Sequence, residues 1–144
     1  MSREHAQRPT QASAWSGLRV GLDLVAIARM QESLDRFGDR FYRRVFTPAE
    51  IAYCESSPAE RTRRYAARYA AKEAAWKALS LDDTGHAWTA IEVVRQDHGV
   101  SVVLHDPLAA RALARCTTAI SVSITHEAGY AAAVVLAHTA PPGH

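Results

Sequence analysis

The central helix of this chain is predicted by the stretch Arg68-Tyr69-Ala70-Ala71-Lys72-Glu73-Ala74-Ala75-Trp76-Lys77-Ala78. At about 3.6 residues per turn, one side of this helix carries four large apolar side chains: Tyr65, Tyr69, Trp76 and Leu79. Lys72 falls inside this apolar arc and Glu73 at its edge, so both charges border the predicted core. Such charges are costly to bury unless they meet an ion, a ligand or each other. The alanines of the other flank either favour the helix or let another backbone or a bulky ligand approach closely.

Of the 17 Lys and Arg residues in the chain, only those at positions 72 and 77 are lysine. Two compact ammonium groups on either side of Glu73 indicate a functional site, because lysine and arginine are not interchangeable. Glu73 and Lys77 are also four residues apart, which is the spacing of a helical ion pair. An ordinary surface pair worth roughly 0.2–0.5 kcal/mol is therefore the alternative interpretation.

Composition predicts one compact domain, since 144 residues that are 48% hydrophobic can bury a single sizeable core. No apolar run is long enough to span a membrane, and residues 1–16 lack the hydrophobic centre of a signal peptide, so we expect a cytoplasmic protein without a membrane partner. Cys54 and Cys116 show no ligand spacing, which favours thiols over a disulfide or a zinc site. A net charge of +2 is too weak to indicate nucleic-acid binding.

We predict a flexible N-terminal extension over residues 1–16, a domain over 17–138 and a loose tail over 139–144. The domain should begin with a strand over 18–23 that ends at Asp23, because apolar and other residues alternate there. An amphipathic helix follows over 25–37, and a capping box at Thr47 opens a short helix. Two hairpins are expected over 90–105 and 120–136, the second with His126 at its tip. Between them, a helix should direct Leu108 and Leu113 into the core.

Two groups of arginines remain open to two interpretations. Arg29, Arg36 and Arg40 line up if the helix over 25–37 continues, and they form either a solvated face or a docking surface for an acidic partner. The second group, which precedes and enters the central helix, is either solvated or binds phosphates. It consists of Arg61, Arg63, Arg64 and Arg68.

Asp23 and Glu73 together suit magnesium, because Mg²⁺ binds through one or two carboxylates plus substrate phosphates. Two acids beside a Lys and Arg cluster therefore describe a phosphate-transfer site. The chain contains neither GxxxxGK[ST] nor GxGxxG, so its phosphates would have to be held by side chains.

Three segments closely resemble the signatures of 4′-phosphopantetheinyl transferases: Gly21-Leu22-Asp23-Leu24-Val25-Ala26-Ile27-Ala28-Arg29, Arg68 to Ala78 as quoted above, and Ser121-Val122-Ser123-Ile124-Thr125-His126. The resemblance runs in order from about Leu18 to Leu136 and includes Arg44-Val45-Phe46-Thr47 and Tyr130-Ala131-Ala132-Ala133. The short chain fits the holo-acyl-carrier-protein synthase type.

The resemblance implies transfer of the phosphopantetheine arm of coenzyme A to a serine of an apo acyl carrier protein. In that reaction Asp23 and Glu73 would hold Mg²⁺, Glu73 would help to deprotonate the serine, and Lys77 would neutralise charge on the phosphates. Three residues would contact phosphates of coenzyme A: Arg68, Lys72 and His126. Four arginines would dock the acidic carrier, which comes from fatty-acid or polyketide synthesis: Arg29, Arg36, Arg40 and Arg44.

The same resemblance implies an α+β fold with antiparallel strands and a long central helix, assembled as a trimer with coenzyme A between subunits. The sequence departs from the family pattern over 80–85 and over 99–101, so recognition of coenzyme A or the carrier is expected to differ there. The extension over 1–16 suggests a dedicated polyketide or peptide-synthesis carrier. The alternative function is a non-catalytic carrier-binding or assembly module of the same fold.

Overall fold

The computed structural model describes residues 17–80 and 87–141. Its elements are β1 (Leu18–Ala26), α2 (Ile27–Phe37), α3 (Asp39–Val45), α4 (Pro48–Glu55), α5 (Arg61–Leu79), the 3-10 helix η1 (Trp88–Ala90), β2 (Ile91–Gln96), β3 (Gly99–Leu104), α6 (Leu108–Ala114), β4 (Thr117–Glu127) and β5 (Tyr130–Thr139). Three predicted segments lie wholly or partly outside the described residues: the extension over 1–16, most of the divergent segment over 80–85 and the end of the tail. The expected α+β class with antiparallel strands and a long central helix is confirmed.

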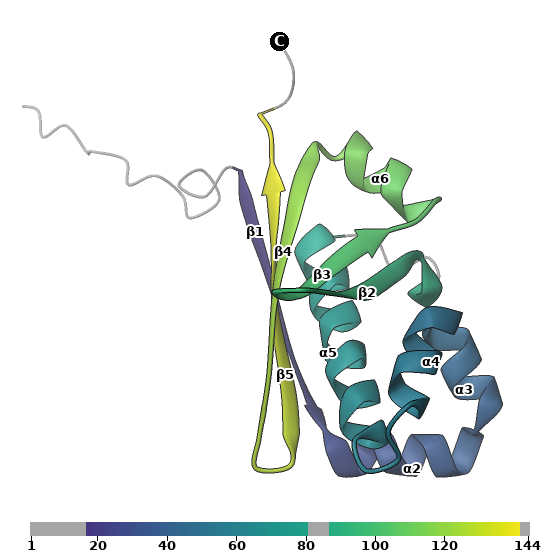
Figure 1. Ribbon diagram of the computed structural model, residues 1–144. Helices are drawn as coiled ribbons and strands as arrows, with labels where there is room; N and C mark the ends of the chain where they lie inside the picture. Colours follow the sequence, from purple (N-terminus) through teal and green to yellow (C-terminus); the bar gives the residue numbers. More distant parts are fainter. Residues whose placement is uncertain (1–16, 81–86, 142–144) are drawn as a thin grey trace, which may run out of the picture.

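A three-stranded antiparallel sheet in the order β1-β5-β4 carries α5 on one face (Figure 1). Helix and sheet approach closely because the contact is made of small residues. Ala70, Ala74 and Ala78 are fully buried, and a Cβ on Gly21 would lie 1.8 Å from the carbonyl oxygen of Ala74. The alanine flank of α5 therefore serves a backbone approach, and Gly21 is required by the space between β1 and α5.

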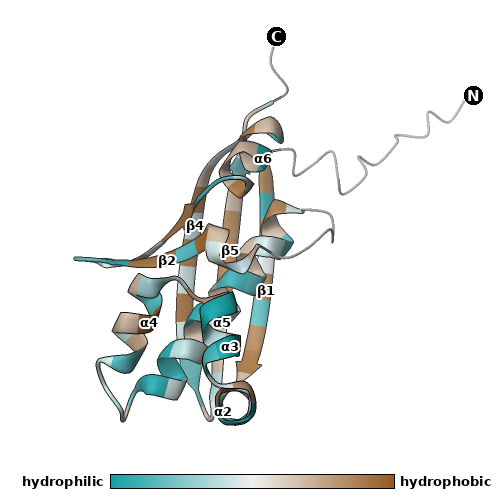
Figure 2. Cartoon of the chain, turned by 90° about the vertical axis from the view of Figure 1, so that its right-hand side faces the viewer, coloured by the Kyte–Doolittle hydropathy of each residue, from teal (hydrophilic) through white to brown (hydrophobic). Residues whose placement is uncertain are grey.

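The alternating pattern of β1 predicts that its apolar residues are buried, but in the structure they are the exposed ones. Val20, Leu22 and Leu24 are 63–64% exposed on the face away from α5, whereas Gly21 is buried. The predicted end at Asp23 is also wrong, because β1 continues to Ala26 opposite Tyr130 of β5. Figure 2 shows hydrophobic stretches along β1, β4 and β5. Among the described residues, no element covers the three apolar side chains on this outer face of β1.

Three helices, α2, α3 and α4, pack beside α5 around a second core that contains Met30, Phe46 and Tyr65. The predicted end of α2 at Gly38 is confirmed, with a left-handed φ of 54° at that residue. Helix α3 was not predicted, and it starts a new axis after Gly38. The capping box is confirmed, since Thr47 and Glu50 bond to each other's backbone N–H.

The short helix α6 lies toward one end of the molecule, and the hairpin of β2 and β3 crosses nearer its middle (Figure 1). Leu108 is buried as expected, but Leu113 is 73% exposed, so its predicted place in the core is wrong. Ordered strand structure also reaches Thr139, one residue into the predicted tail. Among the described residues, no helix is both long and apolar enough to cross a membrane.

Candidate active site

The two predicted acids line one cavity between β1, α2, α3 and α5. Asp23 comes from the α5-facing side of β1, and Glu73 comes from α5 itself. Arg29 and Tyr69 also line this cavity, whose volume is about 420 Å³. Two carboxylates that are 50 residues apart in the chain are therefore brought to a single site by the packing of α5 on β1.

Lys77 extends this site along α5. Its ammonium donates to the carbonyl oxygen of Leu22 at 2.9 Å and to the Asp23 carboxylate at 3.2 Å. The Lys77 side chain is 51% exposed, so its charge remains accessible to a ligand. The alternative in which Lys77 pairs with Glu73 as a surface ion pair is wrong, because the partner of Lys77 is Asp23.

The Glu73 carboxylate is held by a phenol. Tyr69, one turn earlier on α5, donates its hydroxyl to Glu73 Oε1 at 3.2 Å. Burial, followed by the charge and hydrogen bond of Glu73, raises the pKa of Tyr69 to about 12. The phenol therefore keeps its proton near neutral pH and acts as a donor.

Lys72 occupies a different environment from Lys77. Its side chain is 0% exposed, and its ammonium is 2.6 Å from the carboxylate of Glu50, itself 1% exposed. The ammonium also donates to the carbonyl oxygens of Trp88 at 3.1 Å and Ile91 at 2.5 Å. Burial lowers the pKa of Lys72, and the Glu50 carboxylate opposes that change. This corrects the expectation that Lys72 contacts a phosphate, because its ammonium is enclosed and fully paired in the core.

Arg68 belongs to a cluster of guanidinium groups around the ring of Tyr53. The Arg64, Arg68 and Arg95 Cζ atoms lie 4.2, 4.0 and 4.8 Å from the ring centroid. Arg68 is only 5% exposed, and its Nε has no hydrogen-bond partner among the described residues. Arg68 and Arg95 line a cavity of about 220 Å³. The cluster was not predicted, since Arg95 and Tyr53 are distant in sequence and carry no motif.

The remaining predicted residues lie outside the cavity of Asp23 and Glu73. His126 is in β4 rather than at the hairpin tip, which is formed by Ala128 and Gly129, and its Nε2 is 2.6 Å from a guanidinium nitrogen of Arg63. Arg36, Arg40 and Arg44 are exposed on α2 and α3. They form no salt bridge within residues 17–80 and 87–141.

The donor set of this site fits Mg²⁺. Asp23 and Glu73 supply hard carboxylate oxygens to one cavity, and the described part of the chain has no group of three or more His, Cys, Asp or Glu that could enclose a metal. Mg²⁺ characteristically takes one or two carboxylates and completes its shell with water and substrate phosphates. An adjacent, accessible ammonium adds charge for a phosphorylated substrate.

Comparison with known proteins gives a consistent result. Residues 19–135 match the family ACPS, the 4′-phosphopantetheinyl transferase superfamily. A holo-[acyl-carrier-protein] synthase of Koribacter versatilis is 41% identical over 83% of this chain and 96% of its own length. That of Anaeromyxobacter sp. (strain K) is 45% identical over 86% of this chain and 98% of its own length. Among solved structures, the Chronobacterium ammoniagenes ACPS-CoA complex superposes with a TM-score of 0.78 and 32% identity, covering 86% of this chain and 98% of that one.

Proposed function

Because the chain belongs to the 4′-phosphopantetheinyl transferase superfamily, as an enzyme of the holo-acyl-carrier-protein synthase type, we propose that it modifies a fatty-acid or polyketide carrier protein in an Mg²⁺-dependent reaction. The reaction transfers 4′-phosphopantetheine from coenzyme A to a serine of the apo carrier and releases adenosine 3′,5′-bisphosphate. The observation that carries the proposal is the shared cavity of Asp23 and Glu73, with Lys77 bonded to Asp23 beside it.

Asp23 and Glu73 would hold the Mg²⁺. When bound, the ion supplies positive charge to the pyrophosphate of coenzyme A. Lys77 would contact the bridging and leaving phosphates. A movable ammonium can neutralise their charge without bidentate geometry. Its half-exposed ammonium supports this role. Glu73 would accept the proton of the attacking serine, directly or through water, since a general base needs only reach and a suitable pKa.

Arg68 would bind a phosphate of coenzyme A. Its Nε, which has no hydrogen-bond partner within the described part of the chain, and the neighbouring Arg95 support this role, because a guanidinium fork matches phosphate oxygens. His126 would add a contact at the 3′-phosphate, and the adjacent Arg63 would contribute positive charge. Lys72 is not one of the proposed phosphate contacts, because its ammonium is buried against Glu50.

The acidic carrier would dock on the basic surface of α2 and α3. Arg36, Arg40 and Arg44 are exposed there, and Arg29 lies at the cavity, where it could bridge the docking surface and the reaction site. Complementary charge of this kind increases association rate and selectivity more than affinity.

The active assembly would be a homotrimer with coenzyme A bound between neighbouring subunits. The uncovered apolar face of β1, with Val20, Leu22 and Leu24, supports this proposal, because exposed apolar patches of this kind mark interaction surfaces. Sedimentation equilibrium of the chain, and of a Leu22→Asp variant, tests the assembly.

Glu73→Gln tests the chemistry of the site. The variant keeps the size and hydrogen-bonding reach of the side chain but removes its charge and basicity, so transfer should be abolished. Unfolding in urea should change little, because Glu73 is only partly buried and forms no ion pair with a described residue. Unchanged turnover would remove Glu73 from the mechanism and favour the interpretation of a carrier-binding module.

A further inference from the structure

We infer that Tyr69 is a positioning residue that orients the Glu73 carboxylate for the reaction, and this inference rests on the proposed function. Tyr69 and Glu73 are four residues apart on α5, and the Tyr69 hydroxyl donates to Glu73 Oε1 at 3.2 Å. Both side chains line the cavity that Asp23 shares. The hydroxyl is therefore part of the site and not only of the helix surface.

The two carboxylates of the cavity are each oriented by one donor. Asp23 receives the ammonium of Lys77, whereas the only hydrogen bond of the Glu73 carboxylate within the described residues comes from Tyr69. A Glu side chain has three rotatable bonds, so without this donor its carboxylate can turn freely in a cavity of about 420 Å³. The bond from Tyr69 selects one orientation before any ligand arrives.

The phenol can perform this role because its ring is fixed by other aromatic rings. Tyr69 stacks on Trp88 with ring centroids 5.4 Å apart and leans on Phe41 with centroids 6.4 Å apart. These contacts place the hydroxyl rather than letting it follow the carboxylate. Partners that orient a metal-binding or catalytic side chain typically change metal affinity or activity by roughly 10- to 100-fold when they are lost.

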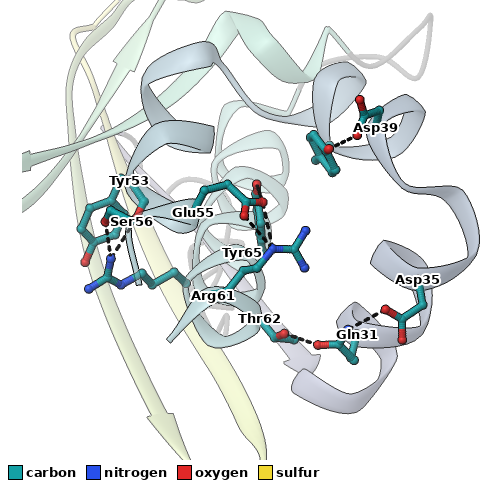
Figure 3. Close-up of polar contacts among 11 residues, drawn as sticks. Gln31, Asp35, Asp39, Tyr53, Glu55, Ser56, Arg61, Thr62 and Tyr65 are labelled. Atoms are coloured by element: carbon teal, nitrogen blue, oxygen red, sulfur yellow. Dashed lines mark hydrogen bonds and ion pairs between the residues drawn. The ribbon is translucent and has the colours of Figure 1, made fainter. Parts of the chain in front are cut away.

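Tyr69→Phe isolates the hydroxyl, because phenylalanine retains the ring and its stacking on Trp88. Tyr65→Phe is a matched control on the same helix. Tyr65 donates its hydroxyl to Glu55 at 2.8 Å, and Figure 3 shows this bond beside Arg61, among residues that do not line the cavity of Asp23 and Glu73. Both variants thus lose one phenol–carboxylate bond of α5, but only Tyr69→Phe loses a bond of the site.

The test measures Mn²⁺ binding to the enzyme–coenzyme A complex by electron paramagnetic resonance, without carrier, together with kcat and KM for transfer. For Tyr69→Phe we expect roughly 10-fold weaker Mn²⁺ binding and a lower kcat with an unchanged KM for coenzyme A. Tyr65→Phe should match the wild type in both. In a Glu73→Gln background, Tyr69→Phe should have no further effect on Mn²⁺ binding, since an amide has already replaced the carboxylate that Tyr69 orients.

The inference is overturned if Tyr69→Phe and Tyr65→Phe give equal Mn²⁺ affinity and equal kcat while the wild type binds Mn²⁺ and transfers phosphopantetheine. It is also overturned if the Tyr69→Phe effect persists in full without the Glu73 carboxylate. A folded wild type that neither binds Mn²⁺ nor transfers contradicts the proposed function itself, and the role of Tyr69 is then rejected with it.

Discussion

Replacing Lys72 by methionine should destabilise the protein more than replacing any exposed charge. The variant removes the cation but leaves Glu50 buried, with its bonds from the backbone N–H groups of Thr47 and Val93 as the remaining compensation. It also removes the donor to the carbonyl oxygens of Trp88 and Ile91. Breaking a buried pair by removing one partner costs about 3–5 kcal/mol, a large share of the roughly 5–15 kcal/mol that stabilises a typical protein.

The other lysine of the helix provides the control. Lys77 is half exposed and pairs with Asp23, and such partly solvated pairs contribute roughly 0–1 kcal/mol to stability. Lys77→Met should therefore unfold in urea near the wild-type midpoint while its kcat for transfer falls by about 10²- to 10³-fold, which is typical when one electrostatic contact to the transition state is lost. Two lysines five residues apart are thus predicted to have opposite phenotypes.

The assay is equilibrium unfolding in urea, followed by circular dichroism at one protein concentration, because assembly adds concentration-dependent stability. The double variant Lys72→Met with Glu50→Gln should recover at least half of the lost free energy, since glutamine removes the stranded charge but still accepts a hydrogen bond from Thr47. A loss below about 1 kcal/mol for Lys72→Met would mean that the buried Glu50 carboxylate does not depend on this cation, and a double variant less stable than the single one would mean the same.

Three further predictions concern the docking surface, the contact of β1 with α5 and the end of α5. Arg40→Glu should raise KM for the carrier while KM for coenzyme A stays constant, whereas Arg111→Glu on α6 should change neither; equal effects on both substrates would argue against docking on α3. Gly21→Ala should destabilise the protein by about 1–3 kcal/mol or more, as measured in urea, because its Cβ would overlap the Ala74 carbonyl; a wild-type midpoint would contradict that close contact. Ser80→Gly should raise the free energy of unfolding by up to about 1 kcal/mol, because Ser80 caps α5 with a left-handed φ of 50°, and a decrease would mean that the serine side chain has a stabilising role.

The central helix and the acid that joins it in the cavity, Asp23, were predictable from sequence because both depend on local patterns. The two lysines on either side of Glu73 and the place of Asp23 in the first strand were enough to propose one site, and the cavity contains both acids. Local patterns could not predict that Lys72 is buried and Lys77 half exposed. Glu50 was recognised only as a capping residue, and its pairing with Lys72 depends on how α4 packs against α5.

A local pattern also could not predict which face of β1 is buried against α5. Alternation predicts a strand with two different faces but does not say which face is covered, and here Gly21 faces α5 while Leu22 faces away. The sequence does not predict α3 as a separate helix, because the residue before it is Gly38, which has no side chain to cap a helix start. The arginine cluster around Tyr53 joins α4, α5 and β2, so only the tertiary structure brings it together.

The transfer reaction is tested most directly by intact-protein mass spectrometry of an apo acyl carrier protein incubated with this protein, coenzyme A and Mg²⁺, beside a matched reaction with a chelator. We predict that the carrier gains the mass of one phosphopantetheine group and that the chelator prevents this gain. An unmodified carrier across fatty-acid, polyketide and peptidyl types, with folded protein, would contradict the transferase assignment, and a gain that persists in the chelator would contradict the metal role of Asp23 and Glu73.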